Sequence, residues 1–548
     1  MRLILLVLGS LTLASCSRER LERAVSRTPT LPSDWPAAGF GVSLPPLDSP
    51  GLNAYQRDAV YLAHLLAAYY PDHRGDRLDT ATLARRTRDF VRELDTVATD
   101  FAWRVRLQGF LAQLRDGHTS AMPRLYTEGE PYFSLSLWPD PDGRGLRLVS
   151  ADSSAVDSTW RGAEVLAIGD LPVDSVFARV RAWHQGENRY YKDAFLRRYE
   201  PLPRYWRSLG CLTGPADPLS LTLRKTDGAT RRITLRPDTA WRAWPSGADT
   251  ARFAFARRQR PAFATAYLPE LRTAYLQMNT SLDWAAMRGE LKNYVPWPLR
   301  LPAKAFMRRE KRRAGAEDFG AVLAELFARV ARDSLRRVVV DLRHNPGGDE
   351  RLGLQLMWHL ADAHGRTDLL GPRTYYRFDG LLRAGVPGDY RRYRRAFAKT
   401  QGREPAPDEW VELDGQVLRQ GFWQGIDAAG STLTLDASVP KFDGELVVLT
   451  GPQTFSAAAI LAATLQDNGL ATVVGEPTGN RPGGPTGASR VKLPHTGTVI
   501  ALSYVSFDRP DPTRAHLDAV YPDVYVPSTY EDYLRGGDPA LEAALGIE

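Results

Sequence analysis

The second half of the chain alternates short apolar runs with amphipathic stretches. The strand-like runs are Ala274 to Met278, Arg337 to Leu342, Gly444 to Leu449 and Ala471 to Gly475, and the helix-like stretches are Phe319 to Ala331, Leu352 to Ala361 and Ala457 to Gln466. Short buried strands that alternate with helices are typical of an α/β fold. We therefore predict an α/β domain over residues 260–548, with an Arg- and Tyr-rich insertion at about residues 373–429.

Ser456 stands between one of these strands and the helix that follows it, in the sequence Thr454-Phe455-Ser456-Ala457. The N-terminus of a helix offers unpaired backbone amides and the positive end of a dipole, and both stabilise an oxyanion. Ser456 is thus well placed for nucleophilic attack. Serine is also a favoured N-cap residue, so this position alone does not separate catalysis from helix capping.

A second turn follows the strand Val338 to Arg343 and reads Asn345-Pro346-Gly347-Gly348. Because glycine has no side chain, the backbone amides of such a turn can approach a reacting carbonyl closely. Together with Thr454 to Ala458 and Val473 to Gly479, these motifs resemble the catalytic domain of the tail-specific (C-terminal processing) and tricorn-like serine peptidases.

This resemblance implies a crotonase-like spiral of ββα units that hydrolyses peptide bonds of a polypeptide substrate through an acyl-serine intermediate. Carried over to this sequence, it makes Ser456 the nucleophile and places the oxyanion hole at the backbone amides of Gly348 and Ala457. No cluster of His, Cys and carboxylate residues has metal-ligand spacing, so we expect neither a metal nor a cofactor.

The general base departs from the pattern of the processing peptidases. Where they place a lysine, this chain has Arg481, which stays protonated at any relevant pH. The segment Leu114-Arg115-Asp116-Gly117-His118-Thr119 resembles instead the Asp-x-His-Thr segment of the tricorn-like branch, shared with interphotoreceptor retinoid-binding protein. That resemblance implies His118 as the base, and imidazole titrates near neutrality as such a base requires. We predict a Ser-His enzyme.

The third catalytic residue stays open between several carboxylates. Tricorn-like enzymes use an acidic residue downstream of the nucleophile, and Asp508, Asp511 and Asp518 all lie in that region. We take Asp511 as the working candidate, while Asp116 could orient His118 locally.

The first half of the chain predicts two further domains. Residues 51–128 carry apolar side chains at helical spacing, for example Leu62, Leu65 and Leu66, and predict a small helical domain. Residues 129–240 show short alternating strands. Within them Arg161 to Asp170 resembles part of a PDZ domain, which would bind an extended peptide at a sheet edge. A β domain that only packs against its neighbours fits the same pattern.

The N-terminus carries a targeting signal. Residues 1–15 have a positive start and an apolar stretch, and Leu13-Ala14-Ser15-Cys16 resembles the lipobox of bacterial lipoproteins. The resemblance implies a lipidated Cys16, a tether over residues 16–50 and a lipid anchor in the bacterial cell envelope, on the periplasmic face of the outer membrane.

The net charge of +7 is spread along the chain, so we expect no nucleic-acid partner. The densest basic run, Arg308 to Arg313, is interpreted as a solvated helix face. The sequence leaves open both a monomer and a homo-oligomer. Two other functions also stay open: a binding protein for apolar ligands or peptides on the same fold, and a hydrolase of non-peptide esters or amides.

Overall fold

The computed structural model describes residues 50–547 except 76–77, 122–124, 126–128, 215, 245–252, 257–260, 296, 314–317, 361–368, 407–408 and 413–440. The predicted signal peptide, Cys16 and nearly all of the tether lie outside the described residues, as does the last part of the predicted insertion. In the part of the chain that is described, no helix combines the length and the apolarity needed to cross a bilayer.

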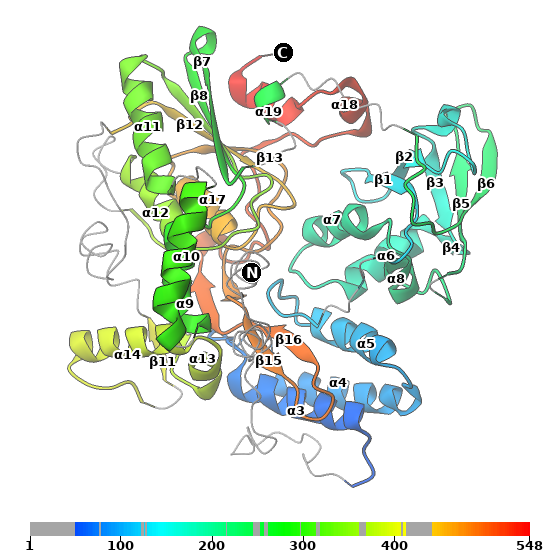
Figure 1. Ribbon diagram of the computed structural model, residues 1–548, viewed down its shortest axis with the longest axis horizontal. Helices are drawn as coiled ribbons and strands as arrows, with labels where there is room; N and C mark the ends of the chain where they lie inside the picture. The colour runs from blue at the N-terminus through cyan, green and yellow to red at the C-terminus, as the bar shows by residue number, and fades with distance from the viewer. Residues whose placement is uncertain are drawn as a thin grey trace.

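The N-terminal unit is helical, as predicted. It comprises α3 (Ala54–Tyr69), α4 (Thr80–Glu93), η1 (Leu94–Thr96) and α5 (Asp100–Ala112). Polar caps set the starts of the three α-helices, because the side chains of Asn53, Asp79 and Thr99 accept hydrogen bonds from first-turn amides. Their buried apolar faces share one core with a hairpin far away in sequence, β15 (Ser489–Lys492) and β16 (Val499–Leu502). This shared core joins the N-terminal helices to a hairpin from the last fifth of the described chain, and Figure 1 shows α3, β15 and β16 in the same region.

The middle unit is a six-stranded antiparallel sheet with three helices, on the right in Figure 1. Its elements are β1 (Leu135–Pro139), β2 (Leu146–Ala151), η2 (Ser158–Trp160), β3 (Glu164–Ile168), β4 (Leu171–Pro172), α6 (Val173–Trp183), α7 (Arg189–Tyr199), α8 (Pro203–Ser208), β5 (Leu219–Arg224) and β6 (Thr230–Leu235). Alternation of buried and less buried residues along β5 turns one face of the sheet toward a core that α6 and α8 cover. The segment between α6 and α7 points toward the rest of the molecule.

The third unit is built on a second six-stranded sheet, ordered β18-β13-β12-β9-β8-β7. The strands are β7 (Phe263–Leu268), β8 (Thr273–Met278), β9 (Arg337–Asp341), β12 (Glu445–Thr450), β13 (Thr472–Gly475) and β18 (Val524–Tyr525). All pairs are parallel except β7 with β8. One face packs against α11 (Phe319–Arg332), α12 (Arg351–Trp358) and α17 (Ala457–Asp467), and the other against α19 (Pro539–Leu545). The predicted mixed α/β character of this part of the chain is therefore confirmed.

Residues of the predicted insertion form part of a further four-stranded sheet, ordered β11-β10-β17-β14. Its members are β10 (Arg373–Arg377), β11 (Trp410–Glu412), β14 (Gly484–Thr486) and β17 (Val505–Asp508), and α13 (Gly380–Gly385) and α14 (Pro387–Gln401) connect β10 to β11. The remaining elements are η3 (Ala254–Ala256), η4 (Pro269–Leu271), α9 (Trp284–Tyr294), η5 (Trp297–Leu299), α10 (Arg300–Arg313), η6 (Pro512–Arg514) and α18 (Tyr530–Arg535). The short strand β14 ends this sheet beside the site described next.

Candidate active site

Ser456 occupies a sharp turn between β12 and α17. Its backbone has φ 54° and ψ −126°, a conformation that residues other than glycine rarely adopt. Hydrogen bonds hold this turn: Thr454 Oγ1 donates to the carbonyl of Leu342 (2.9 Å), and the Phe455 amide donates to the carbonyl of Asn345 (2.9 Å). The Ser456 side chain makes no capping hydrogen bond to α17. The helix-capping interpretation of this serine is therefore wrong, and its hydroxyl is available for other contacts.

His118 reaches this hydroxyl from the loop that follows α5. Its Nε2 lies 3.0 Å from Ser456 Oγ and 3.3 Å from Thr486 Oγ1 at the end of β14. The imidazole side chain is 9% exposed. The two residues that the sequence named as nucleophile and base are thus within hydrogen-bond distance.

Asp116 fixes the loop that carries His118 through buried hydrogen bonds. Its carboxylate is fully buried and accepts hydrogen bonds from Thr119 Oγ1 (2.6 Å), Ser503 Oγ (2.7 Å) and Tyr70 OH (3.2 Å). It also accepts the backbone amide of His118 at 2.9 Å. The side chains are farther apart, with 4.0 Å between Asp116 Oδ1 and His118 Nδ1. Asp116 therefore fixes the loop and places a negative charge near the imidazole.

Burial lowers the pKa of His118 below its ordinary value of 6.5, and the charge of Asp116 partly opposes this shift. The imidazole is consequently neutral at neutral pH. With its proton on Nδ1, Nε2 has a lone pair directed at the serine hydroxyl, as general-base catalysis requires.

Gly347 packs directly against the serine, whereas Gly348 packs against Ser281 and Leu282. A methyl group built on Gly347 would lie 2.5 Å from Ser456 Cβ and 2.9 Å from the Ala457 nitrogen. Asn345 Oδ1 accepts the Gly347 amide at 2.9 Å and so shapes this turn. Among the described residues, the amides of Gly348 and Ala457 take part in no hydrogen bond. Both are therefore available to an oxyanion.

Asp511 lies in a different part of the structure. Its carboxylate accepts hydrogen bonds from the amide and hydroxyl of Thr513, and its own amide donates to Asp467 Oδ2 at 3.1 Å. Asp467 is the last residue of α17, whose first residue follows Ser456 directly. A helix of 11 residues is about 16 Å long, so Asp511 sits about that far from the serine. The structure does not bring Asp511 to His118.

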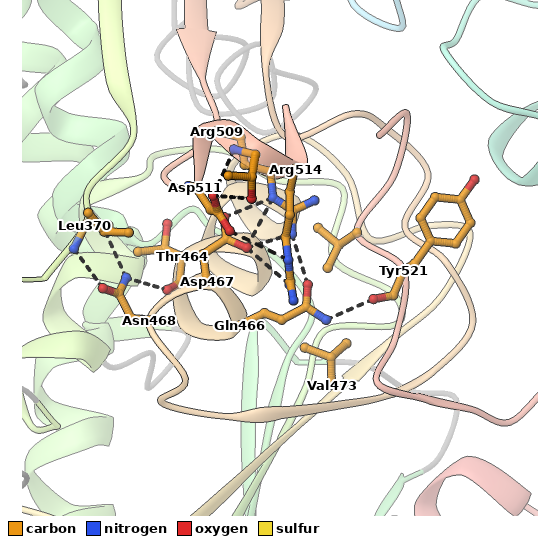
Figure 2. Close-up of polar contacts among 12 residues, drawn as sticks. Leu370, Thr464, Gln466, Asp467, Asn468, Val473, Arg509, Asp511, Arg514 and Tyr521 are labelled. Carbon is orange, nitrogen blue, oxygen red and sulfur yellow. Dashed lines mark hydrogen bonds and ion pairs between the residues drawn. The ribbon is translucent and has the colours of Figure 1, made fainter. Parts of the chain in front are cut away.

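Asp467 and Arg509 form the centre of the network around Asp511 (Figure 2). The two side chains are 0% and 2% exposed and their closest charged atoms are 2.7 Å apart. Around them, Gln466 Nε2 donates to the carbonyl of Tyr521 at 2.9 Å. This network anchors the end of α17 opposite to Ser456.

The other two downstream carboxylates are also engaged elsewhere. Asp508 pairs with His73, Arg74 and Arg373 at the far end of β17. Asp518 accepts a hydrogen bond from the hydroxyl of Tyr521 at 2.9 Å. Asp518 also lies 4.0 Å from a guanidinium nitrogen of Arg115, which belongs to the same loop as His118. Of the four carboxylates that the sequence left open, Asp116 is the one that contacts His118 itself.

The guanidinium group of Arg481 binds a backbone carbonyl. One of its terminal guanidinium nitrogens donates to the carbonyl of Ala515 at 2.6 Å. The neighbouring Asn480 accepts the Ser456 amide through Oδ1 at 2.8 Å. The loop that carries a lysine in the processing peptidases therefore positions the serine backbone here.

Glu187, in the segment between α6 and α7, and Tyr191, in the first turn of α7, contact the neighbours of both His118 and Ser456, and no sequence pattern predicted this. Glu187 Oε1 accepts the amide of Gly117, next to His118, at 3.3 Å. The ring of Tyr191 stacks on Phe455 with 4.5 Å between centroids, and Phe455 lies 4.8 Å from the His118 ring. The middle unit thus contacts the residues before the serine and before the histidine.

Comparison with known proteins relates part of the chain to a peptidase family. Residues 310–526 match the model of peptidase family S41, so this stretch of the chain is similar to that family. The matched residues include Gly348, Ser456 and Ala457, whereas His118 lies before them.

One curated relative is a carboxyl-terminal-processing protease of Picosynechococcus sp., which is 34% identical over 134 residues. This match covers 24% of the present chain and 30% of the relative, so it spans less than a third of that protein's length. The chain is thus a homologue of a C-terminal processing protease over that stretch.

Two solved structures share the overall fold. Mature CPAF is 15% identical, and the match covers 90% of this chain and 95% of CPAF with a TM-score of 0.56. A CPAF mutant gives the same identity and coverage with a TM-score of 0.57. At this identity the likeness concerns the fold alone.

Proposed function

We propose that the protein is a serine peptidase of the bacterial cell envelope, with Ser456 as nucleophile and His118 as general base. The observation that carries the proposal is the 3.0 Å contact between His118 Nε2 and Ser456 Oγ on a strained turn. The similarity of residues 310–526 to family S41 supports the assignment to peptidases.

The contacts of the site suggest the reaction sequence. His118 Nε2 removes the hydroxyl proton as Ser456 Oγ attacks the peptide carbonyl, and the amides of Gly348 and Ala457 stabilise the oxyanion. The imidazolium then protonates the leaving amine, and an acyl-serine remains. Water, deprotonated by the same imidazole, attacks the ester and releases the acid.

In this proposal Asp116 takes the third role. Its charge, 4.0 Å from Nδ1, stabilises the imidazolium that forms during attack, and its hydrogen bonds keep the loop in place. Asp511 is left out of the triad because its contacts lie at the far end of α17.

We further propose the surrounding architecture and location. The third unit is the crotonase-like catalytic domain, and the sheet β1–β6 with α6 is a PDZ-like domain that receives an extended polypeptide. The lipobox-like Cys16 anchors the protein to the envelope membrane, so that the substrate is a polypeptide of that compartment.

The test is labelling by a fluorophosphonate probe together with cleavage of an unstructured protein substrate. We expect the parent chain to react with the probe and cleave, and Ser456→Ala and His118→Ala to do neither while remaining folded. Asp511→Asn serves as the matched control and should behave as the parent. A folded parent chain that is inert to the probe would overturn the proposal and favour a binding protein. Reaction with the probe and with small esters, but not peptides, would point to an ester hydrolase.

A further inference from the structure

Helix α10 presents an exposed basic face. The helix contains seven Lys and Arg residues and one acidic residue, Glu310. At 100° per residue, Leu301, Lys304, Arg308 and Arg312 fall on one side, and each of them is exposed. The opposite side contributes Ala303 and Met307 to a small buried cluster with α9.

The described residues contain no acidic partner for the three cations Lys304, Arg308 and Arg312 of this face. Lys311, at the edge of the face, pairs with Asp318 at 2.5 Å. No ion pair joins Lys304, Arg308 or Arg312 to any acidic residue in the described part of the chain. With respect to the described part of the chain, the face therefore keeps a positive charge that an external partner can neutralise.

Two large apolar side chains stand at the N-terminal end of the same face. Trp297, in the turn before α10, is 78% exposed, and Leu301 is 76% exposed. They are the two most exposed large apolar side chains of the described residues. A merely solvated helix gains nothing from such exposure, whereas Trp and Leu beside Lys and Arg are typical of segments that dock at a membrane interface.

We propose that the exposed side of η5 and α10, formed by Trp297, Leu301, Lys304, Arg308 and Arg312, docks on an anionic lipid surface. The cations contact lipid phosphates, and Trp297 and Leu301 enter the headgroup region. Charge complementarity selects this occupant, because the face has a row of cations and an apolar tip. Figure 1 shows α10 far from the β1–β6 sheet, so docking leaves that sheet accessible.

This docking is independent of the proposed peptidase and of lipidation at Cys16. The sequence alone favoured a solvated face at Arg308 to Arg313. The exposure of Trp297 and Leu301 is the reason to assign a membrane partner instead.

The test is co-sedimentation of the full chain carrying Cys16→Ser with vesicles. One set is phosphatidylcholine with a quarter phosphatidylglycerol, and the other is phosphatidylcholine alone. We compare the parent chain with Lys304→Gln/Arg308→Gln/Arg312→Gln, with Trp297→Ser/Leu301→Ser, and with the control Arg86→Gln/Arg144→Gln/Arg236→Gln, whose exposed cations lie elsewhere. The first residues are identical in all four chains, so their own lipid affinity cancels in the comparison.

We expect the α10 triple variant to bind the anionic vesicles about 100-fold more weakly than the parent, with the control triple variant unchanged. The apolar double variant should also weaken binding, and added salt should weaken binding of the parent. Equal binding of parent and α10 triple variant overturns the proposal. So does a parent that binds polyglutamate but not anionic vesicles, which would make the partner an acidic polypeptide. Circular dichroism spectra and urea unfolding midpoints equal to those of the parent show that the variants are folded.

Discussion

His118 Nε2 and Ser456 Oγ lie 3.0 Å apart, although 338 positions of the chain separate the two residues. Two contacts hold the loop after α5 in place. Ser120 forms a β-bridge with Ala501 of β16, and Ser503, between β16 and β17, donates a hydrogen bond to Asp116. The contact between His118 and Ser456 also requires the tight turn that raises Ser456 toward that loop. The following predictions concern this contact and its supports.

The pH dependence of kcat/KM should report the lowered pKa of His118. The neutral imidazole is the active form, so activity is present above the pKa and falls as pH drops through it. Burial lowers that pKa, and the acid limb should therefore lie below pH 6.5, the ordinary value. In Asp116→Asn the limb should move to still lower pH, because the carboxylate raises the pKa. We also expect kcat/KM to fall by about 10- to 100-fold, since the imidazolium loses its counter-charge. A limb that moves to higher pH in this variant would contradict the role of Asp116.

Asp511→Asn should leave the reaction nearly unchanged. The carboxylate contacts Thr513 and Arg514 rather than the imidazole, and it lies near the far end of α17. We expect kcat/KM within about threefold of the parent and an unshifted acid limb. The measurement is the same pH profile as for Asp116→Asn. A loss as large as that of Asp116→Asn would restore Asp511 as a member of the triad.

Gly347→Ala should abolish activity. The added methyl group would lie 2.5 Å from Ser456 Cβ, and Gly347 has φ +90°, which is strained for alanine. The serine turn must therefore shift, and a shift of this size should lower kcat/KM by about 100-fold or more. The matched control is Gly451→Ala at the start of the same turn, where the nearest atom is Arg343 Cγ at 3.7 Å, an ordinary van der Waals distance. Equal activity of the two variants would show that the turn does not depend on close packing at Gly347.

Arg509→Ala should destabilise the fold by about 3–5 kcal/mol, because it leaves the buried carboxylate of Asp467 without its main partner. The exposed pair Arg224 and Glu164 provides the comparison, and Arg224→Ala should cost less than about 1 kcal/mol. Urea unfolding of the three proteins gives both values. If the two substitutions cost the same, the network in Figure 2 is not a structural anchor.

The sequence by itself determined the strands and helices of the α/β domain and the chemistry of the pair Ser456 and His118. The spacing of apolar residues and the positions of turn residues located the strands and helices of the α/β domain. This works because the spacing of apolar residues along a short segment already sets which side chains can be buried together. The motifs around Ser456 and His118 named the residues that lie in contact. They also showed that Arg481 could not replace a lysine base, since guanidinium does not lose its proton.

The tertiary structure decided which carboxylate lies beside the histidine and which distant segments share a core. Asp508, Asp511 and Asp518 are equally plausible in sequence, but the chain after β17 turns toward Asp467 at the far end of α17. The helical unit packs on the β15–β16 hairpin, and residues 373–412 add strands to the sheet of β17. Such contacts depend on packing between segments hundreds of residues apart, and local sequence patterns do not encode which distant surfaces will meet.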